Sequence, residues 1–166
     1  MTFAMTTSKL LPHFDHLGLN SHSIPILLVD DEIVAIRSME LATKAQNVTN
    51  TIAVAHDGEQ ALQLLRNWLG ERRSLPPILI LLDLNMPRMT GLEFLAEIRR
   101  DPVLKRALVF VHSTSDRPSD VEAAYNLNVA GFISKQGQSV DVSNAITMLD
   151  SFASTVVFPG SAQSFA

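Results

Sequence analysis

Three acidic side chains directly follow short apolar runs of the sequence. Asp30 and Asp31 come after the run at 26–29, and Asp83 comes after the run at 78–82. Carboxylates that lie close together repel one another and need a positive counter-charge. Mg²⁺ supplies one, because it binds oxygen ligands and needs only a few carboxylates besides its waters. These acids therefore predict a magnesium site, provided that the fold brings the two runs together.

Hydroxyl and ammonium groups follow two further apolar runs. Ser113 and Thr114 come after the run at 108–112, and Lys135 comes after the run at 131–134. A site that only binds Mg²⁺ needs neither group, but both can donate hydrogen bonds to phosphate oxygens. An aspartate beside a metal can act as a nucleophile and carry a phosphoryl group. The complete set predicts a phosphoryl-transfer site, in which a metal aligns the reactants and neutralises charge.

Each of these residues also has an ordinary structural explanation. Asp30 and Asp31 could cap a helix, Asp83 could belong to a turn, Ser113 could cap the next helix and Lys135 could lie in solvent. A common site is favoured because all five residues fall at successive ends of predicted strands.

Five strands and five helices are predicted to position these residues. Uniformly apolar runs predict strands that are buried on both faces, and spacings of three and four predict helices. The strands are expected at 26–29, 51–55, 78–82, 108–112 and 131–134, and the helices at 33–44, 59–69, 92–100, 118–127 and 140–152. Their alternation predicts an α/β fold with a five-stranded doubly wound parallel sheet. Ligands of such sheets bind beyond the carboxyl ends of the strands.

Composition narrows the class of protein. The 166 residues suit one domain at 24–154, with an N-terminal extension at 1–23 and a C-terminal tail at 155–166. The sequence has no Cys, which excludes disulfides and thiol catalysis, and its net charge of −4 argues against a broad nucleic-acid surface. Mean hydropathy is +0.17, yet no apolar run approaches the roughly 18 residues of a membrane span, and no signal peptide is evident. We expect a cytoplasmic protein.

With these motifs the sequence resembles the receiver domain of two-component response regulators. The resemblance covers residues 24–154 and implies the flavodoxin-like strand order 2-1-3-4-5 of the chemotaxis response regulator. The motifs are Ile-Leu-Leu-Val-Asp-Asp-Glu at 26–32, Asp-Gly-Glu-Gln-Ala-Leu at 57–62, Leu-Asp-Leu-Asn-Met-Pro-Arg-Met-Thr-Gly at 82–91, Val-His-Ser-Thr-Ser at 111–115 and Gly-Phe-Ile-Ser-Lys at 131–135.

The resemblance implies a role for each acidic residue and for Lys135. Asp83 is expected to accept the phosphoryl group. Asp31 is expected to bind Mg²⁺ directly, Asp30 to act largely through water, and Asn85 to offer its backbone carbonyl to the metal. Lys135 is expected to pair with the phosphoryl oxygens.

Further roles implied by the resemblance concern switching. Ser113, which is expected to be catalytic together with Asp83 and Lys135, occupies the switch position whose hydroxyl bonds the phosphate. Phe132 occupies the aromatic switch position. Asn85, Thr114 and Ser115 are expected to modulate how long the phosphate survives.

The sequence departs from the family pattern at several of these positions. Gln136 stands where the family usually has Pro, and Phe132 lacks the hydroxyl of the common Tyr. Thr114 is bulkier than the usual Ala and is expected to narrow access to the phosphate. His112 replaces an apolar residue, as a hydrogen-bonded strand-end histidine or as a pH-sensitive neighbour of the site.

The expected function is that of a single-domain response regulator. A sensor histidine kinase donates a phosphoryl group to Asp83 in a Mg²⁺-dependent reaction, and a conformational change passes the signal to protein partners. The style of the motifs resembles regulators that pair with phytochrome-type kinases. We expect no enzyme activity beyond the protein's own phosphorylation and dephosphorylation, no DNA-binding domain and no membrane partner.

A homodimer is expected through the fourth helix, fifth strand and fifth helix. This face carries several apolar residues with few charges between them: Val121, Ala124, Leu127, Val129, Val140, Val142, Ile146 and Phe152. Some of these residues are expected to belong to the core, and the alternative is that all of them do. Two alternatives remain for the function. One is a constitutive binding module that is never phosphorylated, and the other is a Mg²⁺-dependent phosphatase of the same fold. Such a phosphatase would need an acid where this chain has Asn85.

Overall fold

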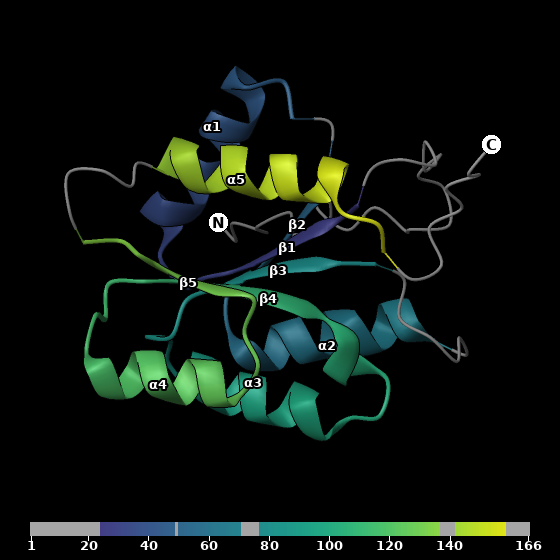
Figure 1. The fold of residues 1–166 in the computed structure, drawn as a ribbon, viewed down its shortest axis with the longest axis vertical. Helices are drawn as coiled ribbons and strands as arrows, with labels where there is room; N and C mark the ends of the chain where they lie inside the picture. The colour runs from purple at the N-terminus through teal and green to yellow at the C-terminus, as the bar shows by residue number, and fades with distance from the viewer. Residues whose placement is uncertain (1–23, 49, 71–76, 137–141, 159–166) are drawn as a thin grey trace, which may run out of the picture.

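The protein forms a five-stranded parallel sheet between two layers of helices (Figure 1). This computed structural model describes residues 24–48, 50–70, 77–136 and 142–158. The strands lie in the order β2-β1-β3-β4-β5. Their bounds are β1 Ile26–Val29, β2 Ile52–Ala55, β3 Leu79–Leu82, β4 Leu108–Ser113 and β5 Gly131–Ser134. The predicted fold class and strand order are therefore confirmed.

Two helices cover one face of the sheet and three cover the other. In Figure 1, α1 and α5 lie together above the sheet, and α2, α3 and α4 lie below it. Each layer covers its own buried apolar cluster, so every central strand is enclosed on both faces. The helices are α1 Ile33–Ala45, α2 Gly58–Leu69, α3 Gly91–Arg100, α4 Pro118–Asn126 and α5 Val142–Thr155, with a short 3-10 helix at Leu104–Arg106.

The register of the sheet aligns the ends of its strands. Val29 at the end of β1 pairs with Leu82 at the end of β3. The amide of Asp83 then donates to the carbonyl of Val29 at 2.8 Å, which continues the ladder by one residue. On the other side of β3, Leu82 pairs with Val111 of β4. The residues that follow β1 and β3 are thereby brought side by side.

Most predicted boundaries agree with the structure within two residues, and the differences have local causes. The turn expected at Asp57 and Gly58 is the start of α2, because the Asp57 side chain accepts from the Gln60 amide and caps the helix. The 3-10 helix follows Asp101, whose carboxylate accepts from the amides of Val103 and Leu104. This short element has no periodic pattern that a sequence reading could detect.

The apolar face predicted for α4, β5 and α5 is divided between core and surface. Ala124, Val129 and Ile146 are buried in the core, so they cannot meet a partner. Val121, Leu127 and Phe152 are half-buried. The Val140 position and the Val142 side chain lie outside the described parts, as do the predicted extension at 1–23 and most of the predicted tail.

No helix in the described residues combines the length and the apolar character needed to cross a membrane.

Candidate functional site

Asp30, Asp31 and Asp83 come together at the carboxyl edge of the sheet. Asp30 and Asp83 are buried and Asp31 is exposed, and one carboxylate oxygen from each lies within 4.8 Å of the others. The set contains only hard oxygen donors and concentrates negative charge, which is the donor chemistry that Mg²⁺ and similar divalent cations take. The three acids therefore fit a divalent metal site, as the sequence predicted.

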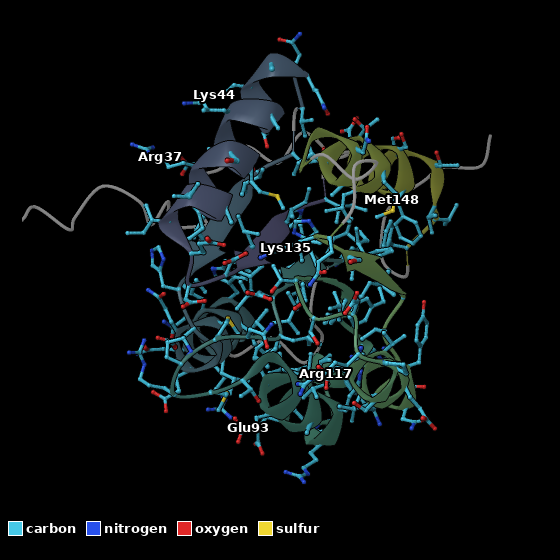
Figure 2. All side chains as sticks on the ribbon, turned by 90° about the vertical axis from the view of Figure 1, so that its left-hand side faces the viewer. Arg37, Lys44, Glu93, Arg117, Lys135 and Met148 are labelled. Atoms are coloured by element: carbon cyan, nitrogen blue, oxygen red, sulfur yellow. The ribbon has the colours of Figure 1, made fainter. Side chains whose placement is uncertain are left out.

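Lys135 supplies the positive charge on the other side of these acids. Its ammonium nitrogen lies 2.8 Å from Oδ2 of Asp30 and 3.5 Å from Oδ2 of Asp83, and its side chain is only 11% exposed. In Figure 2 Lys135 lies between the helix layer of α1 and α5 and the layer of α2, α3 and α4. The explanation of Lys135 as a solvated loop lysine is therefore wrong.

Lys135 keeps its charge in this environment. Burial alone would lower the pKa of Lys135, but the hydrogen bond and charge of Asp30, together with Asp83, outweigh burial and raise the pKa. The ammonium group therefore stays protonated next to the acids. A buried charge of this kind is costly without partners, so removing Lys135 would leave Asp30 and Asp83 without their cation.

Ser113 and Asn85 form a second, neutral part of the site. The Ser113 hydroxyl is completely buried and accepts from the Asn85 side-chain amide at 3.4 Å and from the Ser115 backbone amide at 3.3 Å. The Asn85 side chain also donates to the Thr114 hydroxyl at 3.3 Å, and its backbone amide donates to Asp83 Oδ1 at 3.3 Å. These long contacts place the predicted switch and modulating residues around Asp83.

The helix-cap explanations are also inconsistent with the structure. Glu32 is the N-cap residue of α1, and Arg117 is the N-cap residue of α4; neither makes a side-chain cap hydrogen bond. Asp31 and Ser113 are therefore not the N-cap residues of these helices. Asp30 does accept from the Glu32 amide at 2.9 Å, while its other oxygen faces Lys135.

Phe132 and Gln136 lie on the far side of the site, on and after β5. Phe132 pairs with Val111 in the sheet and packs, half-buried, against the cluster beneath α2, α3 and α4. The Gln136 side chain donates to the backbone carbonyl of Thr114. The residue that replaces the usual Pro thus links the loop after β5 to the loop after β4.

His112 is buried next to the site and is only 3% exposed. Its Nδ1 atom has no hydrogen-bond partner among the described residues, so the expectation of a fully hydrogen-bonded histidine is wrong for that atom. Burial first, and then the charge of Lys135, lowers the pKa of His112 to about 4, although the Asp83 charge acts in the opposite direction. His112 is therefore neutral near pH 7.

Sequence reasoning missed an ion pair beside the acidic cluster. Arg88 donates to the carboxylate of Asp57, 31 residues away in the chain. The spacing of Asp57 and Gln60 is a capping signal that could have identified the start of α2. The pairing with Arg88 leaves no such signal, because it depends on how the loop between β3 and α3 folds.

Comparison with known proteins agrees with this geometry. Residues 26–147 match the family model of the response regulator receiver domain. The chain belongs to this family. It is 37% identical over 136 residues to response regulator Rcp1 of Synechocystis sp., a match that covers 81% of this chain and 92% of Rcp1. It is 34% identical over 128 residues to the nitrate/nitrite response regulator NarL of Escherichia coli, and spans only 55% of that longer protein.

Solved structures are similar over the same region. The Mn²⁺-bound form of Rcp1 has a TM-score of 0.67 and 35% identity, with 82% of this chain and 99% of that chain covered. The phosphorylated cyanobacterial phytochrome response regulator RcpA has a TM-score of 0.71, with the same identity and coverage. A receiver related to this one thus holds a divalent cation, which agrees with the acidic cluster found here.

Proposed function

We propose that this receiver accepts a phosphoryl group on Asp83 from the phosphohistidine of a sensor kinase. The observation that carries the proposal is the buried Asp83 carboxylate, which lies between two further acids and the Lys135 ammonium group. A carboxylate oxygen of Asp83 attacks phosphorus and the phosphorus–nitrogen bond breaks. The imidazole, which carries a proton on its other ring nitrogen, leaves with the electron pair. An aspartyl phosphate and a neutral histidine result.

The side chains of Asp30, Asp31 and Asp83, with the backbone carbonyl of Asn85, would hold Mg²⁺. When bound, the cation neutralises charge on the transferring group. Lys135 acts from the other side, where its ammonium group attracts the phosphoryl oxygens. Its position is set in advance by Asp30, which limits the reorganisation needed during the reaction.

The change of conformation begins, in this proposal, at Ser113. Its hydroxyl leaves the long contact with Asn85 and donates to a phosphoryl oxygen, which draws the loop after β4 toward Asp83. Phe132 lies on the neighbouring strand and is only half-buried, so turning its ring inward would bury surface that is now exposed. The modified protein populates this second state because the phosphoryl group binds it better.

A phytochrome-type histidine kinase is the proposed donor. RcpA is described as a phytochrome response regulator and RtBRR as a bacteriophytochrome response regulator, the latter with 29% identity to this chain and a TM-score of 0.64. We place the exchange in the cytoplasm, where ATP supplies the phosphoryl groups of kinases. The signal then passes to protein partners through the changed surface, without an enzymatic activity beyond turnover of the aspartyl phosphate.

A homodimer through α4, β5 and α5 completes the proposal. Tyr125 at the end of α4 is 51% exposed, and Met148 of α5, which Figure 2 labels, is also exposed. These side chains leave apolar surface on the proposed face. Light scattering with and without beryllofluoride is expected to show a dimer mass that Tyr125→Glu lowers. An unchanged monomer mass in every sample would contradict it.

Phosphorylation of the purified full chain tests the main proposal. Acetyl phosphate with Mg²⁺ is expected to add one phosphoryl group by intact mass, and Asp83→Asn and EDTA are each expected to prevent it. Absence of a label, with no change in amide spectra on adding beryllofluoride and Mg²⁺, would favour a constitutive binding module. Repeated turnover of a phosphoester substrate would favour a phosphatase.

A further inference from the structure

We propose that Arg88 is a positioning residue for the metal site, because its ion pair with Asp57 fixes the loop that carries the Asn85 carbonyl. This inference rests on the function proposed above, in which that carbonyl is a metal ligand. The loop in question runs from Leu84 to Thr90, between β3 and α3.

Both oxygens of the Asp57 carboxylate are engaged. Oδ1 accepts from the Gln60 amide at 2.7 Å and caps α2, and Oδ2 accepts from the Arg88 guanidinium. The Asp57 side chain is 11% exposed, whereas that of Arg88 is 59% exposed. The guanidinium therefore reaches from the surface to a carboxylate that α2 already holds in place.

The next residue of the loop makes a second contact with the start of α2. A Cβ atom placed on Gly58 would lie 2.7 Å from Cγ of Met89, so Met89 packs directly on the Gly58 backbone. Two successive loop residues, Arg88 and Met89, thus meet two successive residues of the helix start, Asp57 and Gly58. One contact is ionic and the other is steric.

The ends of the loop are also held next to Asp83. The amide of Gly91 donates to the carbonyl of Leu84 at 3.0 Å, and a Cβ atom on Gly91 would lie 2.3 Å from the carbonyl oxygen of Asp83. Asn85 therefore lies in a short segment between two anchored points. Because Arg88 comes only three positions after Asn85, we expect a movement of Arg88 to shift the Asn85 carbonyl.

The backbone of Arg88 needs support to stay where it is. Its φ angle is +65°, in the left-handed region that side-chain-bearing residues rarely adopt. The ion pair with Asp57 and the packing of Met89 on Gly58 provide that support. Without the ion pair, the loop would be free to relax toward ordinary backbone angles.

The charge of Arg88 and its positioning effect have opposite effects on the affinity of the site for a cation. Asp57 raises the pKa of Arg88 most, through its hydrogen bond and its charge, and Asp31 adds a smaller contribution. The positive charge of Arg88 would oppose the binding of a cation beside Asp31. Removing the guanidinium would strengthen cation binding if charge alone mattered, and would weaken it if positioning mattered.

A double-mutant cycle on the full chain separates these effects. Mn²⁺ affinity is measured by electron paramagnetic resonance of the free ion for wild type, Arg88→Gln, Asp57→Asn and the double variant. Asn remains a good N-cap residue, so Asp57→Asn removes the ion pair while keeping the helix start. Positioning predicts that each single variant weakens Mn²⁺ binding by about tenfold, as is typical for groups that orient metal ligands.

The double variant is expected to bind no more weakly than either single variant, because one shared contact is lost. Arg100→Gln removes an exposed arginine that pairs with Glu97 at the far end of α3, and it is expected to leave affinity unchanged. Arg88→Lys keeps the charge without the planar guanidinium fork and is expected to lose part of the affinity.

The outcomes distinguish this inference from the proposed function. Tighter binding by Arg88→Gln, unchanged binding, or additive losses in the double variant would overturn the positioning role while leaving the metal site intact. Failure of the wild-type protein to bind Mn²⁺ would instead overturn the proposed function. Amide spectra of the metal-free variants check that each one is folded.

Discussion

The two parts of the site differ in how firmly their side chains are held. The charged part consists of the three acids and Lys135, where the Lys135–Asp30 pair is buried and 2.8 Å long. The loop part consists of Ser113, Thr114 and the Asn85 side chain, joined by neutral contacts of 3.3 to 3.4 Å. Charge-assisted hydrogen bonds are about twice as strong as neutral ones, and long contacts are weaker still.

This difference shows how one site can both bind tightly and switch. In the proposed function the charged part holds a metal and a phosphoryl group in a fixed arrangement, and its buried ion pair resists rearrangement. Each neutral hydrogen bond of the loop part contributes only about 1 kcal/mol, so exchanging one for a contact to phosphate costs little. We expect variants of the charged part to affect chemistry and variants of the loop part to affect the conformational response.

The largest expected effect is that of Lys135→Ala. Loss of the ammonium group removes a preorganised charge from the reacting oxygens, and losing one such donor typically slows a reaction by about a hundredfold or more. The measurement is the initial rate of acetyl-phosphate labelling. Lys105→Ala, at an exposed lysine of the 3-10 helix, is the control and is expected to keep the wild-type rate. Equal labelling rates for both variants would contradict the assignment of the phosphoryl-transfer chemistry to the charged part of the site.

His112 is expected to link stability to pH. Its folded pKa of about 4 lies below its ordinary value of 6.5, so the unfolded chain binds the proton more tightly. The contribution of neutral His112 to the free energy of unfolding is fully present above about pH 6.5 and is lost as the pH falls toward 4. Urea unfolding at pH 7 and pH 5 is expected to show a loss of about 2 kcal/mol from this group. His112→Leu should reduce that loss; the same loss in the variant would assign it to other groups.

Ser113→Ala is expected to separate chemistry from switching. Phosphorylation should continue within about tenfold of the wild-type rate, because the hydroxyl is not the nucleophile. The amide shifts of the loop after β4 on adding beryllofluoride should be lost, and Ser113→Thr should restore them. Normal shifts in the alanine variant would show that another group draws the loop inward.

The smallest effect is expected for Gln136→Ala. This exposed side chain joins the loops after β4 and β5 in the described conformation, so its removal favours any rearranged state. A neutral exposed hydrogen bond contributes at most about 1 kcal/mol, which corresponds to about a fivefold change in the conformational equilibrium. Beryllofluoride titration followed by amide spectra measures the change. Weaker apparent binding would contradict the role of Gln136 as a restraint on the resting state.

The parts that could be predicted from the sequence are those with a short-range signal. Buried parallel strands are uniformly apolar, so runs such as 78–82 stand out, and polar residues at their ends mark one edge of the sheet. Topology alone places Asp30, Asp83 and Lys135 at the same edge of the sheet. The Arg88–Asp57 pair and the Gln136 contact could not be predicted, because they depend on loop conformation. The unpaired Nδ1 atom of His112 in β4 depends on the packing around the strand, which the sequence does not specify.

The apolar residues of α4 and α5 show a second limit of prediction from the sequence. Spacing identified Ala124 and Ile146 as apolar positions but could not tell whether each faces the core or a partner. A helix that lies against a sheet can bury positions on more than one side when its neighbours also cover it. Only the packed structure assigns those residues to the core and leaves Tyr125 outside.

The strand register also has a consequence for the newly made chain. Asp30 and Lys135 are separated by 105 positions in sequence, and they meet only when β5 has joined the sheet beside β4. A ribosome-bound fragment that ends after β3 would carry all three acids without the cation that balances them. Under the proposed function, competence to receive a phosphoryl group therefore arrives only with β5, after the part of the chain that carries all three acids has been made.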